Sequence, residues 1–382
     1  MIKIAHFGTF DVDNYGDLLF PYIAEYRLPK YDWEHISPTN NNTVFKDSLP
    51  IISFDNAKRN KYHAIVIGGG NILHLKQSKN TVYKNMDGFA YANLWVGAAK
   101  MAMEQKIPYI FNAPGVSKKI KGYIHEKIAQ LTFENSNYVA LREKYSLDLA
   151  RRVIKNPQKQ GLHTAIIPDT AFEIDRMWPI ENKDSFKYIS VNLNSRYHKP
   201  TSATAQNLDE ISLQLKMPIK LIIIGDCHGD KEFTQKVSSE MKTEHEIFQS
   251  DSLKKIAHII GCSSYFFGSS MHAFITAMAF GVPAFLILNK MPAHKFIGLL
   301  EITEIDRKVI CESFEEVREV LEFPAILKNT VKKRIQADLD AHWNHVDDII
   351  KKGKPSHPSI LVVNYNSLLR LQLQINKIKN WI

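Results

Sequence analysis

The chain has 382 residues, of which 45% are hydrophobic and 23% charged, a composition typical of globular proteins and not of disordered or fibrous ones. At about 100–200 residues per domain, this length predicts two domains. The net charge of +9 favours anionic partners. The basic residues are scattered and form no stripe with aromatic residues, which argues against nucleic acid as a partner. Three widely spaced cysteines argue against a disulfide framework or a structural zinc site and fit a reducing cytoplasm.

Short apolar runs recur along the chain, and a longer segment with helical spacing follows each of them. In the first half these predicted strands are Ile2–Phe7, Ala64–Ile67, Tyr109–Asn112, Tyr138–Leu141 and Ala165–Ile167. In the second half they are Tyr188–Leu193, Leu221–Ile224, Tyr265–Phe267, Ala284–Leu288 and Val309–Cys311. Near-continuous apolar strands that alternate with helices are typical of parallel sheets covered on both faces. The sequence therefore predicts an α/β fold with one parallel sheet in each half.

The predicted break between the halves is the polar stretch 175–185, after which the pattern restarts with a strand. We expect an N-terminal domain over residues 1–178 and a C-terminal domain over 186–350. Residues 351–382 form a C-terminal extension, in which Ser367–Ile382 is a predicted helix. This helix is expected to dock on the body of the protein, with a role at a membrane surface as the alternative.

Two segments bear on the expected location of the protein. The apolar run at the N-terminus ends at Gly8 and is too short for a signal peptide. Phe266–Leu288 carries no formal charge and is long enough to cross a membrane, but serines, a histidine, Gly281 and Pro283 interrupt it. We interpret this segment as strand, turn, helix and strand. The expectation is a soluble, cytoplasmic protein, with peripheral association at the inner face of the membrane left open.

The turn after the first strand, Gly8–Asp17, is the first candidate site. Small and Asx residues between a strand and a helix leave backbone N–H groups facing a ligand. Asn14 could cap the following helix with Asp17 in its first turn, and a purely structural cap is the alternative interpretation. The turn matches neither G-x-G-x-x-G nor a Walker A motif, so neither a dinucleotide fingerprint nor a P-loop is predicted.

Three glycines, Gly68 to Gly70, precede Asn71 directly after a predicted strand and form the second candidate site. Glycines at a strand end permit positive φ angles and close approach of a ligand. A tight structural turn is the alternative, but it needs fewer glycines. We therefore expect this turn to face a binding cleft.

The third candidate site is the strand-to-helix turn Gly268–Ala273. The hydroxyls of Ser269 and Ser270, the neighbouring N–H groups of Met271 and a helix N-terminus together favour an anion. His272 in the first helical turn could then act as an acid or a base on the bound group. The alternative is a histidine that is merely buried in the core.

The fourth candidate site follows the first strand of the second half. Asn192, Asn194 and Arg196 alternate, so an extended chain places all three on one face, and Arg196 could hold a carboxylate or a phosphate. A solvated strand end is the alternative. Asp226 and His228 end another strand and are weaker candidates. No pair of residues has the spacing of metal ligands, so no metal is predicted.

Taken together, these segments resemble the polysaccharide pyruvyl transferase family. The resemblance runs in order over about residues 1–305. The matching pieces are Asn14-Tyr15-Gly16-Asp17, Gly68–Asn71, Pro114-Gly115, Leu141-Arg142-Glu143, Pro168-Asp169-Thr170, Gly268–His272 with Gly281-Val282-Pro283, and the helix start at Lys295. Some family members carry arginine where this chain has Ser270 and Asn194, and Arg196 lies two residues beyond the second of these positions, on the same face.

The resemblance implies two Rossmann-like domains arranged as in GT-B glycosyltransferases, with the active site in the cleft between them. It also implies transfer of a pyruvyl group from phosphoenolpyruvate to a sugar or glycan acceptor, possibly lipid-linked, with no further cofactor. The implied catalytic residues are His272 and Asp17. The implied donor side comprises Ser269, Ser270, Met271, Arg196, Asn194 and Asn192, and the implied acceptor side comprises Asn14, Tyr15, Gly16, Gly69, Gly70 and Asn71.

Two other functions fit the same residues. A nucleotide-sugar glycosyltransferase on the same frame would hold a diphosphate at Gly268–His272 and use Asp17 or His272 as the base. A non-catalytic sugar- or phosphate-binding protein would keep the cleft without the chemistry, although a histidine at the anion turn argues against it.

Overall fold

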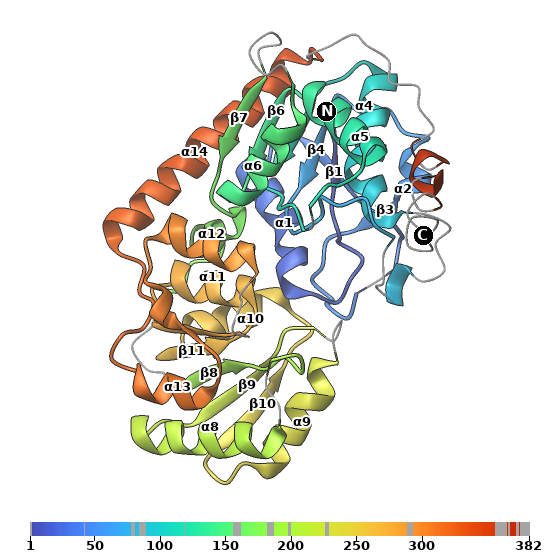
Figure 1. Cartoon of the computed structure of the whole chain (residues 1–382). Helices are drawn as coiled ribbons and strands as arrows, with labels where there is room; N and C mark the ends of the chain where they lie inside the picture. The colour runs from blue at the N-terminus through green and yellow to red at the C-terminus, as the bar shows by residue number, and fades with distance from the viewer. Residues whose placement is uncertain are drawn as a thin grey trace.

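A computed structural model gives the fold of the chain. It describes residues 2–41, 43–77, 81–83, 89–117, 119–155, 162–181, 187–197, 200–225, 229–288, 293–355, 365, 367–371 and 374. These residues form two parallel sheets, one in each half of the chain, with helices around them (Figure 1). The predicted α/β fold with two parallel sheets is confirmed.

The seven-stranded sheet of the first half has the order β3-β2-β1-β4-β5-β6-β7, and all of its strands are parallel. Its strands are β1 (Lys3–Phe7), β2 (Asp32–Ser37), β3 (Ile51–Ser53), β4 (Ala64–Gly68), β5 (Tyr109–Asn112), β6 (Tyr138–Leu141) and β7 (His163–Ile166). The strand order reverses between β1 and β4. Ligands of open α/β sheets bind beyond the carboxyl ends of the strands at such a switch point.

The six-stranded sheet of the second half repeats this arrangement with the order β10-β9-β8-β11-β12-β13. Its strands are β8 (Ile189–Asn192), β9 (Ile219–Ile223), β10 (His245–Gln249), β11 (Tyr265–Gly268), β12 (Ala284–Ile287) and β13 (Ile310–Cys311). The switch point of this sheet lies between β8 and β11. Each sheet therefore offers one binding position at its carboxyl edge.

The helices connect the strands and cover the sheets. They are α1 (Tyr15–Arg27), α2 (Phe54–Ala57), α3 (Ala90–Ala92), α4 (Ala98–Gln105), α5 (Tyr123–Glu134), α6 (Lys144–Val153), α7 (Ile174–Met177), α8 (Thr201–Leu215), α9 (Asp230–Glu240), α10 (Leu253–Gly261), α11 (Met271–Ala279), α12 (His294–Thr303), α13 (Phe314–Glu319) and α14 (Asn329–Lys352). A π-helical turn, Asn93–Gly97, joins α3 to α4, and 3₁₀ turns occur at Thr81–Tyr83, Thr170–Glu173 and Arg307–Val309. None of the helices in the described part of the chain combines the length and the apolarity that a membrane span requires.

Three strands, β2, β3 and β10, were not predicted from the sequence. β3 and β10 are edge strands, and β2 lies next to β3. β3 has only three residues, and β2 and β10 mix polar with apolar residues along their length. Such strands lack the continuous apolar run that marks a strand buried on both faces. The segment Phe266–Leu288, in contrast, forms β11, α11 and β12 as predicted.

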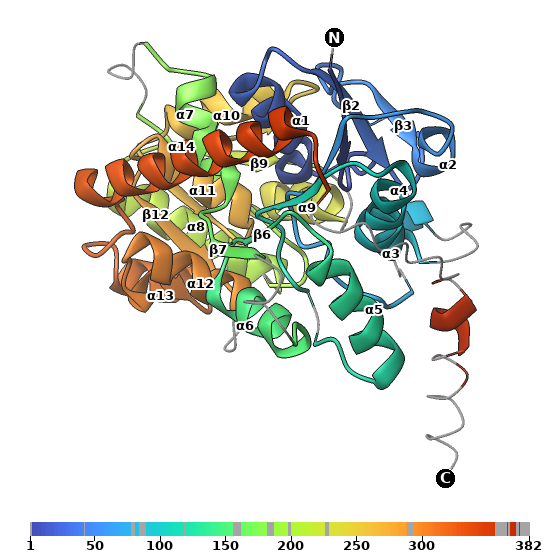
Figure 2. The ribbon, with the colours of Figure 1, turned by 90° about the horizontal axis from the view of Figure 1, so that it is seen from above.

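Helix α14 runs from the second half back along the first (Figures 1 and 2). Its Asp347 accepts a hydrogen bond of 2.5 Å from the Tyr31 hydroxyl, and its His342 Nε2 lies 2.8 Å from Asn112 Oδ1. Most of the predicted helix Ser367–Ile382 lies outside the described residues. Residues 367–371 are helical, and Leu369 is buried in the apolar core of the first half.

The two halves are joined beside the carboxyl edges of their sheets. The Tyr15 amide donates to the Ile224 carbonyl at 2.9 Å, across the junction. Asp47 of the first half accepts a hydrogen bond of 2.9 Å from the Leu253 amide and so caps α10. At Gly225, where φ is +130°, a Cβ atom would lie only 1.9 Å from the Asp13 carbonyl oxygen. These contacts fix a cleft in which the carboxyl edges of both sheets meet.

Candidate active site

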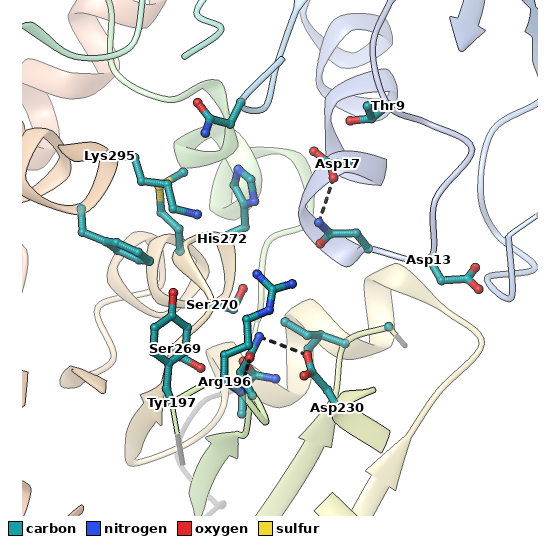
Figure 3. Close-up of a pocket in the computed structure, with 18 of the residues that line it drawn as sticks. Thr9, Asp13, Asp17, Arg196, Tyr197, Asp230, Ser269, Ser270, His272 and Lys295 are labelled. Carbon is teal, nitrogen blue, oxygen red and sulfur yellow. Dashed lines mark hydrogen bonds between the residues drawn. The ribbon is translucent and has the colours of Figure 1, made fainter. Parts of the chain in front are cut away.

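The cleft encloses a cavity of about 210 Å³ (Figure 3). Its walls are the loops that follow β1, β4, β6, β8, β9, β11 and β12. Of the residues predicted from the sequence, those that line it are Asn14, Asp17, Asn71, Asn192, Asn194, Arg196, Ser269, Ser270, Met271 and His272. Segments far apart in the chain therefore meet in a single site, because each follows a strand of one or the other parallel sheet.

The loop after β1 forms both a helix cap and a wall of the cleft. Asn14 is the N-cap of α1: its side-chain oxygen accepts from the Gly16 amide at 3.2 Å, and its Nδ2 donates to Asp17 Oδ2 at 2.8 Å. Burial raises the pKa of the Asp17 carboxyl, although the electrostatic interaction with His272 and a hydrogen bond from Thr9 oppose the rise. Asp17 is therefore a carboxyl group that holds a proton more readily than one in water.

His272 projects from the first turn of α11, for which Ser270 is the N-cap. The ring contacts Phe20 edge-on, at 5.4 Å between centroids, and its Nε2 lies 3.5 Å from Asp169 Oδ2. Burial alone would raise the pKa of Asp169, but the contact with His272 and the charge of Arg142 lower it to about 2. An ionised Asp169 thus lies next to the imidazole, whose buried Nε2 has no hydrogen-bond partner among the described residues.

Gly16 does not line the cavity, although the sequence placed it on the acceptor side of the cleft. A Cβ atom at this position would lie 1.9 Å from Nδ1 of His272. Since non-bonded heavy atoms cannot approach this closely, the ring occupies its place only because residue 16 has no side chain. Gly16 is a positioning residue for His272. It brings the first candidate site, Gly8–Asp17, into contact with the third, Gly268–Ala273.

We therefore expect Gly16→Ala to displace His272, with a loss of about 1–3 kcal/mol in the free energy of unfolding and a large loss of turnover. The matched control is the same substitution in a His272→Ala background, where no ring remains to be displaced. Urea unfolding of the four proteins of this double-mutant cycle measures the coupling. An equal loss of stability in both backgrounds would show that Gly16 acts on something other than His272.

Arg142, directly after β6, is the central cation of the site. Its Nε donates to Glu143 Oε2 and its Nη1 to Asp169 Oδ2, both at 3.1 Å. The third nitrogen, Nη2, is buried without a hydrogen-bond partner, and the residue lines the cavity. A buried guanidinium N–H without a partner is costly unless a ligand accepts from it. Arg142 therefore carries one buried guanidinium nitrogen without a partner at the wall of the cleft.

Lys295 and Arg196 add two further positive side chains from the second half (Figure 3). Burial, together with repulsion by Arg142 and Arg196, lowers the pKa of Lys295 to about 8. An anion bound among these three cations would relieve their mutual repulsion.

The other predicted residues, Tyr15, Gly69 and Gly70, do not line the cavity. Tyr15 is fully buried, and its hydroxyl lies 2.9 Å from Thr276 Oγ1 across the junction of the halves. Gly69 and Gly70 have φ angles of +81° and +72°. A Cβ atom would meet the Phe20 ring at Gly69, and at Gly70 it would lie 2.8 Å from Asp17 Oδ1. The glycines pack against residues of α1 and do not face the cavity. Asn71 is the residue of this turn that lines it.

Several residues of the site were given no role by the sequence analysis. Arg142, Asp169 and Lys295 stand within family-like segments. Arg142 directly follows the buried strand β6, Asp169 lies three positions after β7, and Lys295 lies in the first turn of α12. Further residues that line the cavity are Thr9, Asp13, Ile72, Tyr91, Tyr197, Ile224, Gly225, Asp230 and Phe296. The weaker candidates Asp226 and His228 lie outside the described residues, as does Cys227. Within the described residues no group of three or more potential ligand side chains is placed to hold a metal.

Solved structures with the same architecture include UDP-GlcNAc 2-epimerases. That of Methanocaldococcus jannaschii has a TM-score of 0.54 at 13% identity, covering 89% of this chain and 99% of the other. The enzyme from Neisseria meningitidis has a TM-score of 0.52 at 8% identity, covering 92% and 100%. These likenesses confirm the predicted GT-B-like fold.

No curated protein matches the chain in sequence. The family model for polysaccharide pyruvyl transferase matches residues 14–290, from the capping Asn14 to just beyond β12. This range contains the strand-end loops that supply Asp17, Arg142, Asp169 and His272. The chain therefore belongs to the polysaccharide pyruvyl transferase family, and it is a transferase with a two-domain, GT-B-like α/β fold.

Proposed function

We propose that the chain transfers a pyruvyl group from phosphoenolpyruvate to two hydroxyl groups of a sugar, in a cell-surface polysaccharide or its lipid-linked or nucleotide-linked precursor. The observation that carries the proposal is the cluster of Arg142, Arg196 and Lys295 around one small cavity beside His272. Phosphoenolpyruvate bears a carboxylate and a phosphate on the same carbon atom. A compact trianion of this kind suits three convergent cations with the donor Nη2 of Arg142 among them.

The proposed donor side also includes Asn192, Asn194 and the turn Ser269–Met271. Helix α11 begins at this turn, so its dipole favours negative charge there. The acceptor would enter from the first half, where Asn14 and Asn71 offer polar groups to sugar hydroxyls. This arrangement brings a hydroxyl of the acceptor toward the donor between Asp17 and His272.

The chemistry requires one proton to be added and two to be removed. Protonation of the methylene carbon turns it into a methyl group and leaves a cationic carbon that one sugar hydroxyl attacks. Loss of phosphate and attack by a second hydroxyl close the cyclic ketal. The hydroxyls release two protons, of which one balances the proton given to carbon and the other leaves with phosphate. His272, supported by Asp169, and Asp17 with its raised pKa are the proposed acid–base groups.

A panel of ligands in a thermal-shift assay tests the donor. A ligand that binds only the folded state adds about 2.7 kcal/mol at 100 times its Kd, so phosphoenolpyruvate should raise the Tm visibly. UDP, GDP, CMP and UDP-sugars should not. Stabilisation by a nucleotide alone would favour the second candidate, a nucleotide-sugar glycosyltransferase, since UDP-GlcNAc 2-epimerases share the fold.

Arg196→Ala provides the matched variant for this panel. Removal of one of three cations should weaken phosphoenolpyruvate binding by about tenfold, equal to 1.4 kcal/mol, with the Tm of the free protein nearly unchanged. Lys236→Ala, in an exposed pair with Glu232 outside the cleft, is the control. An unchanged affinity in Arg196→Ala would place the anion elsewhere.

The donor bears on where in the cell the reaction takes place. Phosphoenolpyruvate is a cytoplasmic metabolite, so we place the reaction in the cytoplasm, before the glycan is exported. A lipid-linked acceptor would bring the enzyme to the inner face of the membrane. Cell fractionation followed by immunoblotting distinguishes a free enzyme from a peripherally bound one.

A further inference from the structure

A second cavity, of about 240 Å³, lies on the first half beside the active-site cleft. Three exposed lysines, Lys76, Lys119 and Lys121, line it together with His74 and His125. No carboxylate of the described chain is within ion-pair distance of these lysines. We call this cavity the basic pocket. Its concentration of unneutralised charge favours an anion.

Helix α5 begins at the basic pocket. It has twelve residues, and Gly122, its N-cap residue, has φ of +100° and supplies no side-chain hydrogen bond. The first backbone N–H groups of a helix lack partners within the helix, and the helix dipole adds positive potential at this end. Uncapped helix N-termini with glycine at the cap bind phosphate groups in many proteins.

His125 supplies an independent indication of a ligand. The residue lies in the first turns of α5, is only 8% exposed and lines the basic pocket. Its ring is hydrogen-bonded to the backbone of Lys121, while Nε2 is buried without a partner. A buried ring nitrogen without a partner is costly. A phosphate group satisfies it in either form, by donating from a phosphate hydroxyl to a neutral ring or by accepting from a protonated one.

A pair of adjacent loops lies between the basic pocket and the cleft. Asn71 lines the cleft and His74 lines the basic pocket, so their Cα atoms are at most about 10 Å apart along the chain. The His74 ring lies 4.2 Å from the ring of Tyr91, which also lines the cleft. The second loop runs alongside, with the Leu73 amide donating to the Gly115 carbonyl at 3.1 Å.

From this geometry we propose that the basic pocket is a phosphate-ester subsite, which holds a phosphate group through Lys119, Lys121, His125 and the N-terminus of α5. This inference rests on the proposed function: the phosphate belongs to the acceptor. The enzyme therefore acts on a sugar that is still attached to a phosphate. The short separation of the two cavities allows one molecule to present its hydroxyls in the cleft and its phosphate in the basic pocket.

Lysine acetylation followed by mass spectrometry tests the subsite without any assay of activity. With hexose 1-phosphate at ten times its Kd, about 90% of the pocket is occupied, so acetylation of Lys119 and Lys121 should slow about tenfold. Lys127, on the same helix but outside the basic pocket, is the internal control and should react unchanged. Lys295 lines the cleft, so its acetylation rate measures occupation of the cleft separately.

Unchanged rates at Lys119 and Lys121, or protection confined to Lys295, would overturn the subsite. Protection by inorganic phosphate but not by hexose 1-phosphate would overturn the assignment to an ester. His125→Gln should abolish most of the protection in a protein with an unchanged Tm, and full protection in that variant would remove His125 from the subsite.

The link to the acceptor has its own test. In the Lys119→Gln, Lys121→Gln double variant, the KM for a phosphate-linked acceptor should rise by about tenfold or more, with kcat and the KM for phosphoenolpyruvate unchanged. Lys127→Gln is the control and should behave as the unmodified protein. An unchanged KM for the acceptor would show that the phosphate in the basic pocket is not that of the acceptor, even if lysine protection supports the subsite. Absence of pyruvyl transfer with every acceptor would instead refute the proposed function and leave the protection result standing.

Discussion

Replacing His272 by alanine is expected to lower kcat by a factor on the order of 10²–10⁴, the usual contribution of a general acid–base group. The imidazole is held between Gly16 and Phe20 with Asp169 behind it, and no other described histidine lines the cavity. The fold should survive, because the ring contributes to a wall of the cleft and not to a sheet. Single-turnover kinetics with phosphoenolpyruvate and circular dichroism measure the two effects.

His245→Ala is the matched control for this experiment. His245 belongs to β10, and its ring lies 2.7 Å from the Thr243 carbonyl, away from the cleft. Its substitution should leave kcat close to that of the unmodified protein. Full activity in His272→Ala would remove His272 from the reaction, and an equal loss in both variants would point to a general effect of histidine removal on stability.

Arg142→Met is expected to cost about 3–5 kcal/mol in the free energy of unfolding, in addition to loss of donor binding. The substitution leaves Asp169 and Glu143, both almost fully buried, without their common cation. Removal of one partner from a buried ion pair is costly, because the remaining charge stays desolvated. Chemical unfolding at pH 7.5 measures the loss.

The pH dependence of this loss identifies its cause. Without Arg142 the pKa of Asp169 should rise from its value of about 2, so the carboxyl takes up a proton as the pH falls. A neutral carboxyl costs less to bury, and the destabilisation should therefore shrink at pH 4.5. Lys236→Met, which breaks the exposed pair with Glu232, should cost less than about 1 kcal/mol at either pH. A loss in Arg142→Met that is independent of pH would indicate lost packing and not an unpaired charge.

The sequence by itself determined the α/β class, the two parallel sheets and the strand-to-helix turn at the start of α11. These features depend on neighbouring residues. A strand buried on both faces favours a continuous apolar run, and a helix N-terminus favours a capping residue such as Ser270. Strands β2 and β10 were not predicted because each mixes charged or polar residues with apolar ones and so lacks a continuous apolar run.

The tertiary structure alone decided how the site is assembled. Arg142, Asp169 and His272 come from three loops, separated by 27 and 103 positions, and only the strand order and the docking of the two halves bring them together. The sequence analysis expected Gly16 to contact the ligand. In the docked halves, the missing side chain of Gly16 instead leaves room for the His272 imidazole. Local sequence cannot specify such contacts, because a charged residue after a strand looks alike whether it faces solvent or a partner. Its role depends on which other strand end the completed fold places opposite it.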